Sequence, residues 1–343
     1  MKALVKQRPG PGGLELVDRP DPTPKADEVL IEIAYAGICG TDLHIINGHW
    51  PCTTPIILGH EFCGHVAALG ARVDDLAVGD RIVAGNPART CGNCHHCRGG
   101  NPFMCKKRIS AGFMIDGAFA RFIAMRPNTV HRIPDRVSLQ EAALCEPMAA
   151  AVRALTERLT VNAADRVLVS GVGPIGLLCA AVAKAQGALV IVSGLEADQR
   201  RLACAQEMGA DRVINLDRDD LSQAVNTLTD GAGVDIAVEC AGAPASLEVC
   251  LRSLRKSGSL IQVGIYSKPF ELDFARIVMN DLQVIGVYGH VWTTWERTLT
   301  LMRDKKVDVR PLVTHLFPLD RWSEGLDAIA RGEAIKVLLQ PVG

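Results

Sequence analysis

The sequence predicts an α/β protein in which a doubly wound parallel sheet is joined to a mostly β domain. After Asp165, apolar runs alternate with helix-length segments, which is typical of parallel sheets covered by helices. A Gly-rich turn, 171–176, follows the first of these runs. Before residue 150, short β-type runs such as Val29–Ala36 and Arg81–Ala84 are separated by turns rich in Gly, Pro and Asn.

Composition sets limits on function. The chain has 343 residues, which is enough for two domains, and a formal net charge of −1, which disfavours partners such as nucleic acid or an anionic membrane surface. No run approaches the roughly 18 apolar residues of a membrane span. The start, MKALVKQRPGPGG, lacks the apolar core of a signal peptide, so we expect a cytoplasmic protein. In such a reducing compartment the cysteines, of which there are twelve, bind metal more often than they form disulfides.

The regular half of the chain contains six expected strands, and their continuous Val/Ile/Leu character suits strands buried on both faces. A tail from about Thr294 holds one amphipathic helix pattern, then an extended stretch and a last helix. The expected strands are Val167–Ser170, Val190–Ser193, Val213–Asn215, Ile236–Glu239, Leu260–Val263 and Val284–Val287, and the helix pattern is formed by Trp295, Leu299 and Met302.

The turn after the first of these strands reads G-x-G-x-x-G and opens a helix. The first Gly permits a tight turn, the second lets the backbone approach a pyrophosphate, and the third allows close packing of helix on strand. This placement favours a dinucleotide site over a turn without a ligand. Its residues are Gly171, Val172, Gly173, Pro174, Ile175 and Gly176.

An acidic residue about 20 positions further on should hold the ribose hydroxyls. Glu196 lies at that offset, although it would also serve as a solvated carboxylate at the start of the next helix. Arg201 could pack on the adenine or bind a 2′-phosphate if Glu196 points away. The pattern favours NAD and leaves NADP open.

Two groups of residues suggest metal. Cys91, Cys94, Cys97 and Cys105 have the spacing of a closed structural zinc site, in which His95 and His96 would be surplus and solvent-facing. The second group is dispersed over GICGTDLH (37–44), GHE (59–61) and CEP (145–147). One Cys, one His and one or two carboxylates would leave an open zinc position for substrate, but by themselves these residues also fit a core cysteine and surface polar groups.

These motifs occur in the order found in the zinc-containing medium-chain dehydrogenases, and the resemblance covers essentially the whole chain. Within that family the sequence resembles the sorbitol/polyol and butanediol dehydrogenases and L-threonine 3-dehydrogenase, the last through GVYGH (286–290), TTWERTLTLM and PLVTHLFPLD. The resemblance implies a GroES-like catalytic domain with a zinc lobe at 1–148 and 291–343, a Rossmann domain at 149–290, and a homotetramer.

The resemblance also implies roles for individual residues. Cys39 and His60 match catalytic zinc ligands, and the third ligand is either Glu61 or Glu146. Thr41 and His44 match a proton-relay pair. The loop along the nicotinamide is matched by Val263, Gly264 and Ile265, and the structural zinc lobe by Cys91, Cys94, Cys97 and Cys105.

Two departures from the family pattern concern the cofactor pocket and the substrate pocket. The stretch SGLEADQRR does not place an acid directly at the strand end, so the loop before Glu196 must differ by a residue or two. Arg153 stands where a His is often found, seven positions after the acidic ligand.

We therefore expect an enzyme with two zinc ions per chain that transfers a hydride between a small secondary alcohol, such as a polyol, a diol or an L-threonine-like compound, and NAD(P). The first alternative is an NADP-dependent carbonyl reductase. The second is a catalytically silent zinc- and cofactor-binding protein of the same fold, which would need only the four-cysteine zinc.

Overall fold

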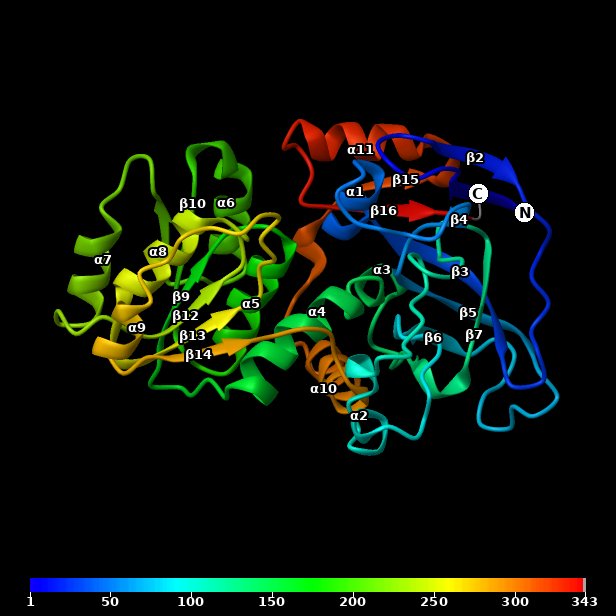
Figure 1. Cartoon of the computed structure of the whole chain (residues 1–343), viewed down its shortest axis with the longest axis horizontal. Coiled ribbons are helices and arrows are strands. Elements are labelled where there is room, and N and C mark those ends of the chain that lie inside the picture. The colour runs from blue at the N-terminus through cyan, green and yellow to red at the C-terminus, as the bar shows by residue number, and fades with distance from the viewer. Residues whose placement is uncertain (342–343) are drawn as a thin grey trace. The chain divides into compact units, whose positions relative to one another are not determined.

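The structure, a computed structural model, describes residues 1–341, and its contacts divide the chain into two compact units. The first unit comprises Met1–Glu146, His290–Asp304 and the chain from Val313 onward. The second unit comprises Pro147–Gly289 and Lys305–Leu312. Figure 1 labels the elements of both units. No helix in the described part of the chain combines the length and apolar character needed to cross a membrane.

The first unit is mostly β. Its larger sheet has the order β15-β16-β3-β5-β6-β8, with β7 also paired to β3, and its smaller sheet has the order β2-β1-β4. The strands are β1 Lys2–Lys6, β2 Leu14–Asp18, β3 Val29–Gly37, β4 Ile56–Ile57, β5 Glu61–Leu69, β6 Arg81–Ala84, β7 Phe122–Met125, β8 Val130–Arg132, β15 Val313–Pro318 and β16 Lys336–Gln340. The helices are α1 Gly40–Ile46, α2 His95–Arg98, α3 Leu139–Ala142, α10 Trp292–Arg303 and α11 Trp322–Ala330, with α4 Cys145–Val152 beginning in this unit and ending in the other.

The register of this sheet brings distant residues together. β3 pairs antiparallel with β5, and Gly37 at the end of β3 lies opposite Glu61 at the start of β5. Cys39, two residues beyond β3, therefore lies beside His60, the residue before β5. On the other side of β3, β16 pairs antiparallel with its end, so that Leu338 faces Gly37. Three segments far apart in the chain thus meet at one end of β3.

The second unit is a six-stranded parallel sheet with the order β11-β10-β9-β12-β13-β14. Counted along the chain this is the order 3-2-1-4-5-6 of a doubly wound dinucleotide-binding sheet. Its strands are β9 Arg166–Ser170, β10 Leu189–Gly194, β11 Arg212–Asn215, β12 Val234–Glu239, β13 Leu254–Gln262 and β14 Gln283–Gly286 (Figure 1). Its helices are α5 Pro174–Ala185, α6 Gln199–Glu207, α7 Leu221–Leu228, α8 Pro244–Ser253 and α9 Ala275–Met279, and a π-helical turn spans Arg153–Arg158.

The central strands are buried on both faces. Consecutive residues of β9, Val167, Leu168 and Val169, are all fully buried. Because neighbouring side chains of a strand point to opposite faces, helices must cover the sheet on both sides. Leu168 packs in a cluster that includes Leu221 of α7 and Leu247 of α8, whereas α5 contacts β9 and β10 outside that cluster.

The predicted fold class is confirmed, and all six predicted strands of the second unit are present. β13 begins at Leu254, six residues before the predicted start, because the polar stretch RKSGS is also extended. The predicted amphipathic helix is α10, and Trp295, Leu299 and Met302 on it are all buried. The extended stretch and last helix correspond to β15 and α11, and the final strand, β16, was not predicted.

Candidate active site

Cys39, His60 and Glu61 form a cluster at the end of β3. Their ligand atoms, one per residue, all lie within 4.8 Å of one another. His60 and Glu61 are buried, and Cys39 is partly buried. Burial and the nearby Glu61 carboxylate both raise the pKa of the Cys39 thiol. A thiol in that setting becomes a thiolate when a metal ion coordinates it, and the set of thiolate, imidazole and carboxylate suits zinc.

Asp42 of helix α1 contacts two members of this cluster, Cys39 and His60. Its Oδ2 accepts a hydrogen bond of 2.9 Å from the backbone N–H of Cys39, which caps helix α1. Its Oδ1 lies 3.6 Å from Nδ1 of His60, an electrostatic contact longer than a hydrogen bond. Burial would lower the pKa of His60, but Asp42 and Cys39 raise it well above its ordinary value. The surroundings of His60 therefore favour a positive charge on its imidazole ring.

Lys336 of β16 is the counterion of Glu61. The two side chains are 2% and 1% exposed and form an ion pair between Nζ and Oε2. Nζ also donates a 3.0 Å hydrogen bond to the carbonyl of Ile38. Burial would lower the pKa of Lys336, but Glu61 and Cys39 raise it. Lys336 thus remains charged and draws one oxygen of Glu61 toward β16.

Glu146 lies outside the 4.8 Å cluster but is close enough to interact electrostatically with His60 and Lys336. Its Oε1 is 3.1 Å from Nε2 of His290. The indole Nε1–H of Trp295, which can only donate, is 2.8 Å from Nδ1 of His290. Nδ1 is therefore the acceptor, and Nε2–H donates to Glu146. Burial would raise the pKa of Glu146, but the hydrogen bond from His290 and the charges of His60 and Lys336 lower it, which favours the carboxylate.

The predicted relay pair lies on α1. Thr41 Oγ1 is 3.7 Å from Sγ of Cys39, and His44, one turn further along the helix, is exposed. At that separation the Cys39 thiol can donate a weak hydrogen bond to Thr41. Once the thiol is deprotonated, the hydroxyl oxygen of Thr41 becomes available to accept another proton.

The four cysteines of the lobe also converge. Sγ of Cys94 lies 3.5 Å from that of Cys97, and Sγ of Cys105 lies 3.5 Å from that of Cys91. Backbone N–H groups of Asn93 and Cys94 lower the pKa of Cys91 to about 6, which favours the thiolate that zinc needs. The four sulfurs all lie within 4.8 Å of one another and can surround one tetrahedral ion. The histidines of this loop, His95 and His96, are exposed, as predicted.

In the second unit, the Gly-rich turn has the expected backbone geometry. Gly171 has φ +102°, a conformation that favours glycine, and a Cβ on Gly176 would collide with the carbonyl oxygen of Gly171. Gly173 is the N-cap of α5, and Pro174 occupies its first turn. Val172 is buried and Ile175 is partly buried beside them. The N–H groups at the start of α5 remain directed at the turn, where a pyrophosphate would bind.

Glu196 lies two residues beyond β10, at the carboxyl end of the sheet. Its carboxylate is already engaged by the side chains of Arg218, Gln199 and Asn215. Arg201 pairs with Asp198 at 3.2 Å. A carboxylate and the guanidinium groups of Arg218 and Arg201 are therefore grouped where the sequence predicts the adenosine ribose, which leaves the choice between NAD and NADP open.

The loop 263–265 is held by a residue that the sequence analysis missed. Glu239, fully buried at the end of β12, accepts 2.9 Å hydrogen bonds from the N–H groups of Ala241 and Gly242. Its backbone carbonyl accepts from Val263 and Gly264 at 3.0 and 2.9 Å. A Cβ on Gly264 would collide with the Glu239 carboxylate, and Ile265 next to it is 58% exposed. Glu239 thus fixes the backbone of this loop while Ile265 stays available for contact.

Arg153 lies in the π-helical turn and is buried. Its guanidinium is 3.9 Å from Glu157, and its Nε has no hydrogen-bond partner in the described structure. Burial lowers its pKa.

Comparison with known proteins identifies the family. Residues 25–135 match the model of the alcohol dehydrogenase GroES-like domain, and residues 174–304 match the model of the zinc-binding dehydrogenases. Two solved structures share the fold over 99% of both chains. They are a zinc-binding dehydrogenase of Sinorhizobium meliloti 1021 bound to NADP (29% identity, TM-score 0.88) and an alcohol dehydrogenase of E. coli CFT073 with NADH (28% identity, TM-score 0.90).

Curated relatives match over nearly the whole chain. The sequence is 39% identical to a sorbitol dehydrogenase of Halalkalibacterium halodurans, covering 100% of both chains. It is 35% identical to a D-arabitol-phosphate dehydrogenase of Enterococcus avium, covering 99% of this chain and 97% of that one. It is 34% identical to an L-threonine 3-dehydrogenase of Pectobacterium carotovorum, covering 99% and 98%. The chain therefore belongs to the zinc-binding alcohol dehydrogenase family.

Proposed function

We propose that this protein transfers a hydride between a small secondary alcohol and NAD or NADP at a zinc ion held by Cys39, His60 and a glutamate. The observation that carries the proposal is the cluster of one thiol, one imidazole and one carboxylate within 4.8 Å, with the Thr41 hydroxyl 3.7 Å from the thiol. The related sorbitol, arabitol-phosphate and threonine dehydrogenases support the substrate class.

The third zinc ligand is either Glu61 or Glu146. The contacts of these two residues suggest that they could alternate as that ligand. Lys336 draws one oxygen of Glu61 away, and His290 occupies one oxygen of Glu146. Each carboxylate keeps a second oxygen that can bind metal. Exchange between them would suit a zinc ion whose coordination changes during turnover.

Residues of the chain itself would then transfer the alcohol proton and orient the nicotinamide. Zinc would supply Lewis-acid stabilisation of the negative charge that develops on the alcohol oxygen, and the nicotinamide would supply the hydride chemistry. We propose that the Thr41 hydroxyl accepts the alcohol proton as it gives up its own, which would pass through the cofactor ribose to His44, exposed one helical turn away, and then to solvent. Val263, Gly264 and Ile265 would support the nicotinamide, with Glu239 fixing their backbone.

The four-cysteine loop is proposed to hold a second, structural zinc ion, and the two units to be the GroES-like catalytic domain and the Rossmann domain. A closed shell of four thiolates leaves no position for substrate, so its contribution is to folding. The twelve cysteines, all in the described part of the chain, form no disulfide there, which supports a reducing, cytoplasmic location.

The experiment that tests this function is a substrate panel run with both cofactors. Sorbitol, 2,3-butanediol and L-threonine would be offered with NAD and with NADP, the corresponding ketones would be offered with NADH and with NADPH, and the metal content of the same sample would be measured. Oxidation of at least one alcohol by protein with two zinc ions per chain is expected. If NADPH-dependent carbonyl reduction is the only activity, the protein is a reductase. If no substrate turns over and one zinc is present, it is a silent member of the fold.

Cofactor choice can be tested at Glu196. Glu196→Ala should raise the KM for NAD about tenfold and lower the KM for NADP, because it removes the ribose-binding carboxylate and frees the guanidinium of Arg218 to meet a 2′-phosphate. Glu207→Ala, an exposed carboxylate at the far end of α6, is the control and should change neither constant. A preference of the unmodified enzyme for NADP would contradict this reading of Glu196.

We also propose that the protein is a homo-oligomer, a tetramer by family resemblance, assembled through the edge strand β14. β14 has a partner on one side only, and Val284 on it is 47% exposed. Val278 and Met279 on nearby α9 are 72% and 73% exposed. Val284→Lys should reduce the mass measured by sedimentation, because a charge on an edge strand opposes pairing. Val78→Lys, at a position of the first unit that is 66% exposed, is the control. A monomeric unmodified protein would contradict the proposal.

A further inference from the structure

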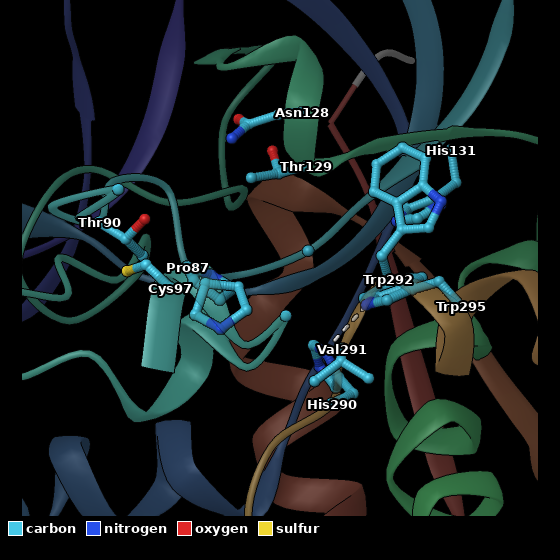
Figure 2. Close-up of a pocket in the computed structure, with 14 residues that line it drawn as sticks. Pro87, Thr90, Cys97, Asn128, Thr129, His131, His290, Val291, Trp292 and Trp295 are labelled. Carbon is cyan, nitrogen blue, oxygen red and sulfur yellow. Dashed lines mark hydrogen bonds between the residues drawn. The ribbon is translucent and has the colours of Figure 1, made fainter. Parts of the chain in front are cut away.

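A cavity of about 290 Å³ lies in the first unit beside the candidate zinc ligands. Figure 2 shows its surroundings: Thr90 and Cys97 of the cysteine loop on one side, Asn128 and Thr129 on another, and the first turns of α10 opposite. Its volume is close to the lower end of the range for small-molecule sites, roughly 300 Å³. Apart from Cys97, none of the predicted site residues lines it.

Aromatic rings form one wall of the cavity. His131 lies between two indoles, with its ring centroid 4.0 Å from that of Trp292 and 5.3 Å from that of Trp295. Trp295 is buried, whereas Trp292 remains 48% exposed although it lines the cavity. The electron-rich face of an exposed indole attracts the partly positive C–H hydrogens of carbons that bear hydroxyl groups. Trp292 therefore offers a stacking surface for a polyol chain.

The cavity is connected to the zinc ligands through His290. This residue lines the cavity, and its Nε2–H donates to Glu146 while its Nδ1 accepts from Trp295. Both ring nitrogens are thus occupied, so His290 serves as a fixed wall between Glu146 and the cavity. His290 thus borders both the cavity and the candidate zinc ligand Glu146.

The charges around the cavity select against anions. None of its fourteen lining residues is Lys, Arg, Asp or Glu. Thr90, Asn128 and Thr129 supply hydroxyl and amide groups, which pair with hydroxyls. Behind the histidines lie two carboxylates, Glu146 and Glu296, the latter 2.8 Å from Nδ1 of His131. A phosphate would therefore meet no Lys or Arg among the lining residues, whereas two carboxylates lie nearby.

We infer that this cavity binds the far, uncharged end of a polyol substrate, with Trp292 as the stacking surface and the threonine and asparagine side chains as hydroxyl partners. The inference rests on the proposed function, because it assigns the substrate class of that same site. It makes this enzyme selective for unphosphorylated polyols over polyol phosphates. It also distinguishes the chain from the D-arabitol-phosphate dehydrogenase that it otherwise resembles.

The kinetic test compares sorbitol, sorbitol 6-phosphate and 2-propanol, a secondary alcohol too short to reach the cavity. Trp292→Ala should lower kcat/KM for sorbitol about tenfold and leave that for 2-propanol within about twofold, with Trp292→Phe intermediate. Leu316→Ala, which truncates an exposed side chain on β15, is the control and should change neither. Sorbitol 6-phosphate should be the poorest of the three. Equal losses for both alcohols, or a preference for the phosphate, would overturn the inference.

A binding measurement separates this inference from the proposed function. Sorbitol added to the zinc-loaded protein without cofactor should change the tryptophan fluorescence, and the change should disappear in Trp292→Ala. If no alcohol is oxidised but this signal is present, the function is wrong and the cavity assignment survives. If alcohols are oxidised and sorbitol leaves the fluorescence of the unmodified protein unchanged, the cavity assignment is wrong and the function survives.

Discussion

Cys39→Ser is expected to remove one zinc ion per chain and to lower alcohol oxidation by on the order of a thousandfold, because the Lewis acid is lost. Cofactor affinity should stay within about twofold of the unmodified value, since the Gly-rich turn belongs to the other unit. Metal content by mass spectrometry, alcohol oxidation and the fluorescence of bound NADH would be measured on one preparation.

The matched variant is Cys94→Ser, which changes the same residue type in the other cluster. It should also lose one zinc ion per chain, but its main effect should be a lower Tm and weaker assembly, because a closed zinc site contributes to folding. The two variants thus separate the two metal sites by their effects. Full activity in Cys39→Ser, or a single zinc per chain in the unmodified protein, would refute the catalytic assignment.

Lys336→Met is expected to reduce the free energy of unfolding of the metal-free protein by about 3–5 kcal/mol, because it leaves the buried Glu61 carboxylate without its cation. The loss should be smaller when zinc is bound, since the ion then supplies the missing positive charge. Urea unfolding with zinc and after chelation gives both values.

The double variant Glu61→Gln/Lys336→Met provides the control for this prediction. Removing both charges should recover most of the lost free energy in the metal-free protein, because a neutral amide is far less costly to bury than an unpaired carboxylate. A loss below about 1 kcal/mol for Lys336→Met after chelation, or no recovery in the double variant, would show that the pair does not carry this energy.

Much of the second unit could be predicted because its signals are local. Each strand is a short run rich in buried β-branched residues. In the Gly-rich turn, each glycine is explained by the strand before it and the helix after it. The four-cysteine lobe is equally local, since all its sulfurs come from one loop. Local patterns of this kind need no knowledge of which strands pair.

The active site depends on strand pairing, which the sequence alone does not provide. Cys39 meets His60 because Gly37 lies opposite Glu61, and Lys336 joins them because β16 pairs with β3. A lysine within AIKVLL near the end of the chain carries no local sign of its partner. His290 was noticed only as part of a family motif, and its contact with Glu146 depends on two segments separated by 144 residues.

The position of β16 has a consequence for how this protein matures. Lys336 and Ile38, which it contacts, are 298 residues apart, and β16 follows the whole second unit in the chain. During synthesis, Cys39, His60 and Glu61 leave the ribosome long before the lysine that neutralises Glu61. Until β16 inserts beside β3, the candidate metal site of the nascent chain carries an excess negative charge and the sheet lacks an inner strand. Zinc that arrives early would balance that charge, so the ion could act as a temporary counterion that assists folding before it takes part in catalysis.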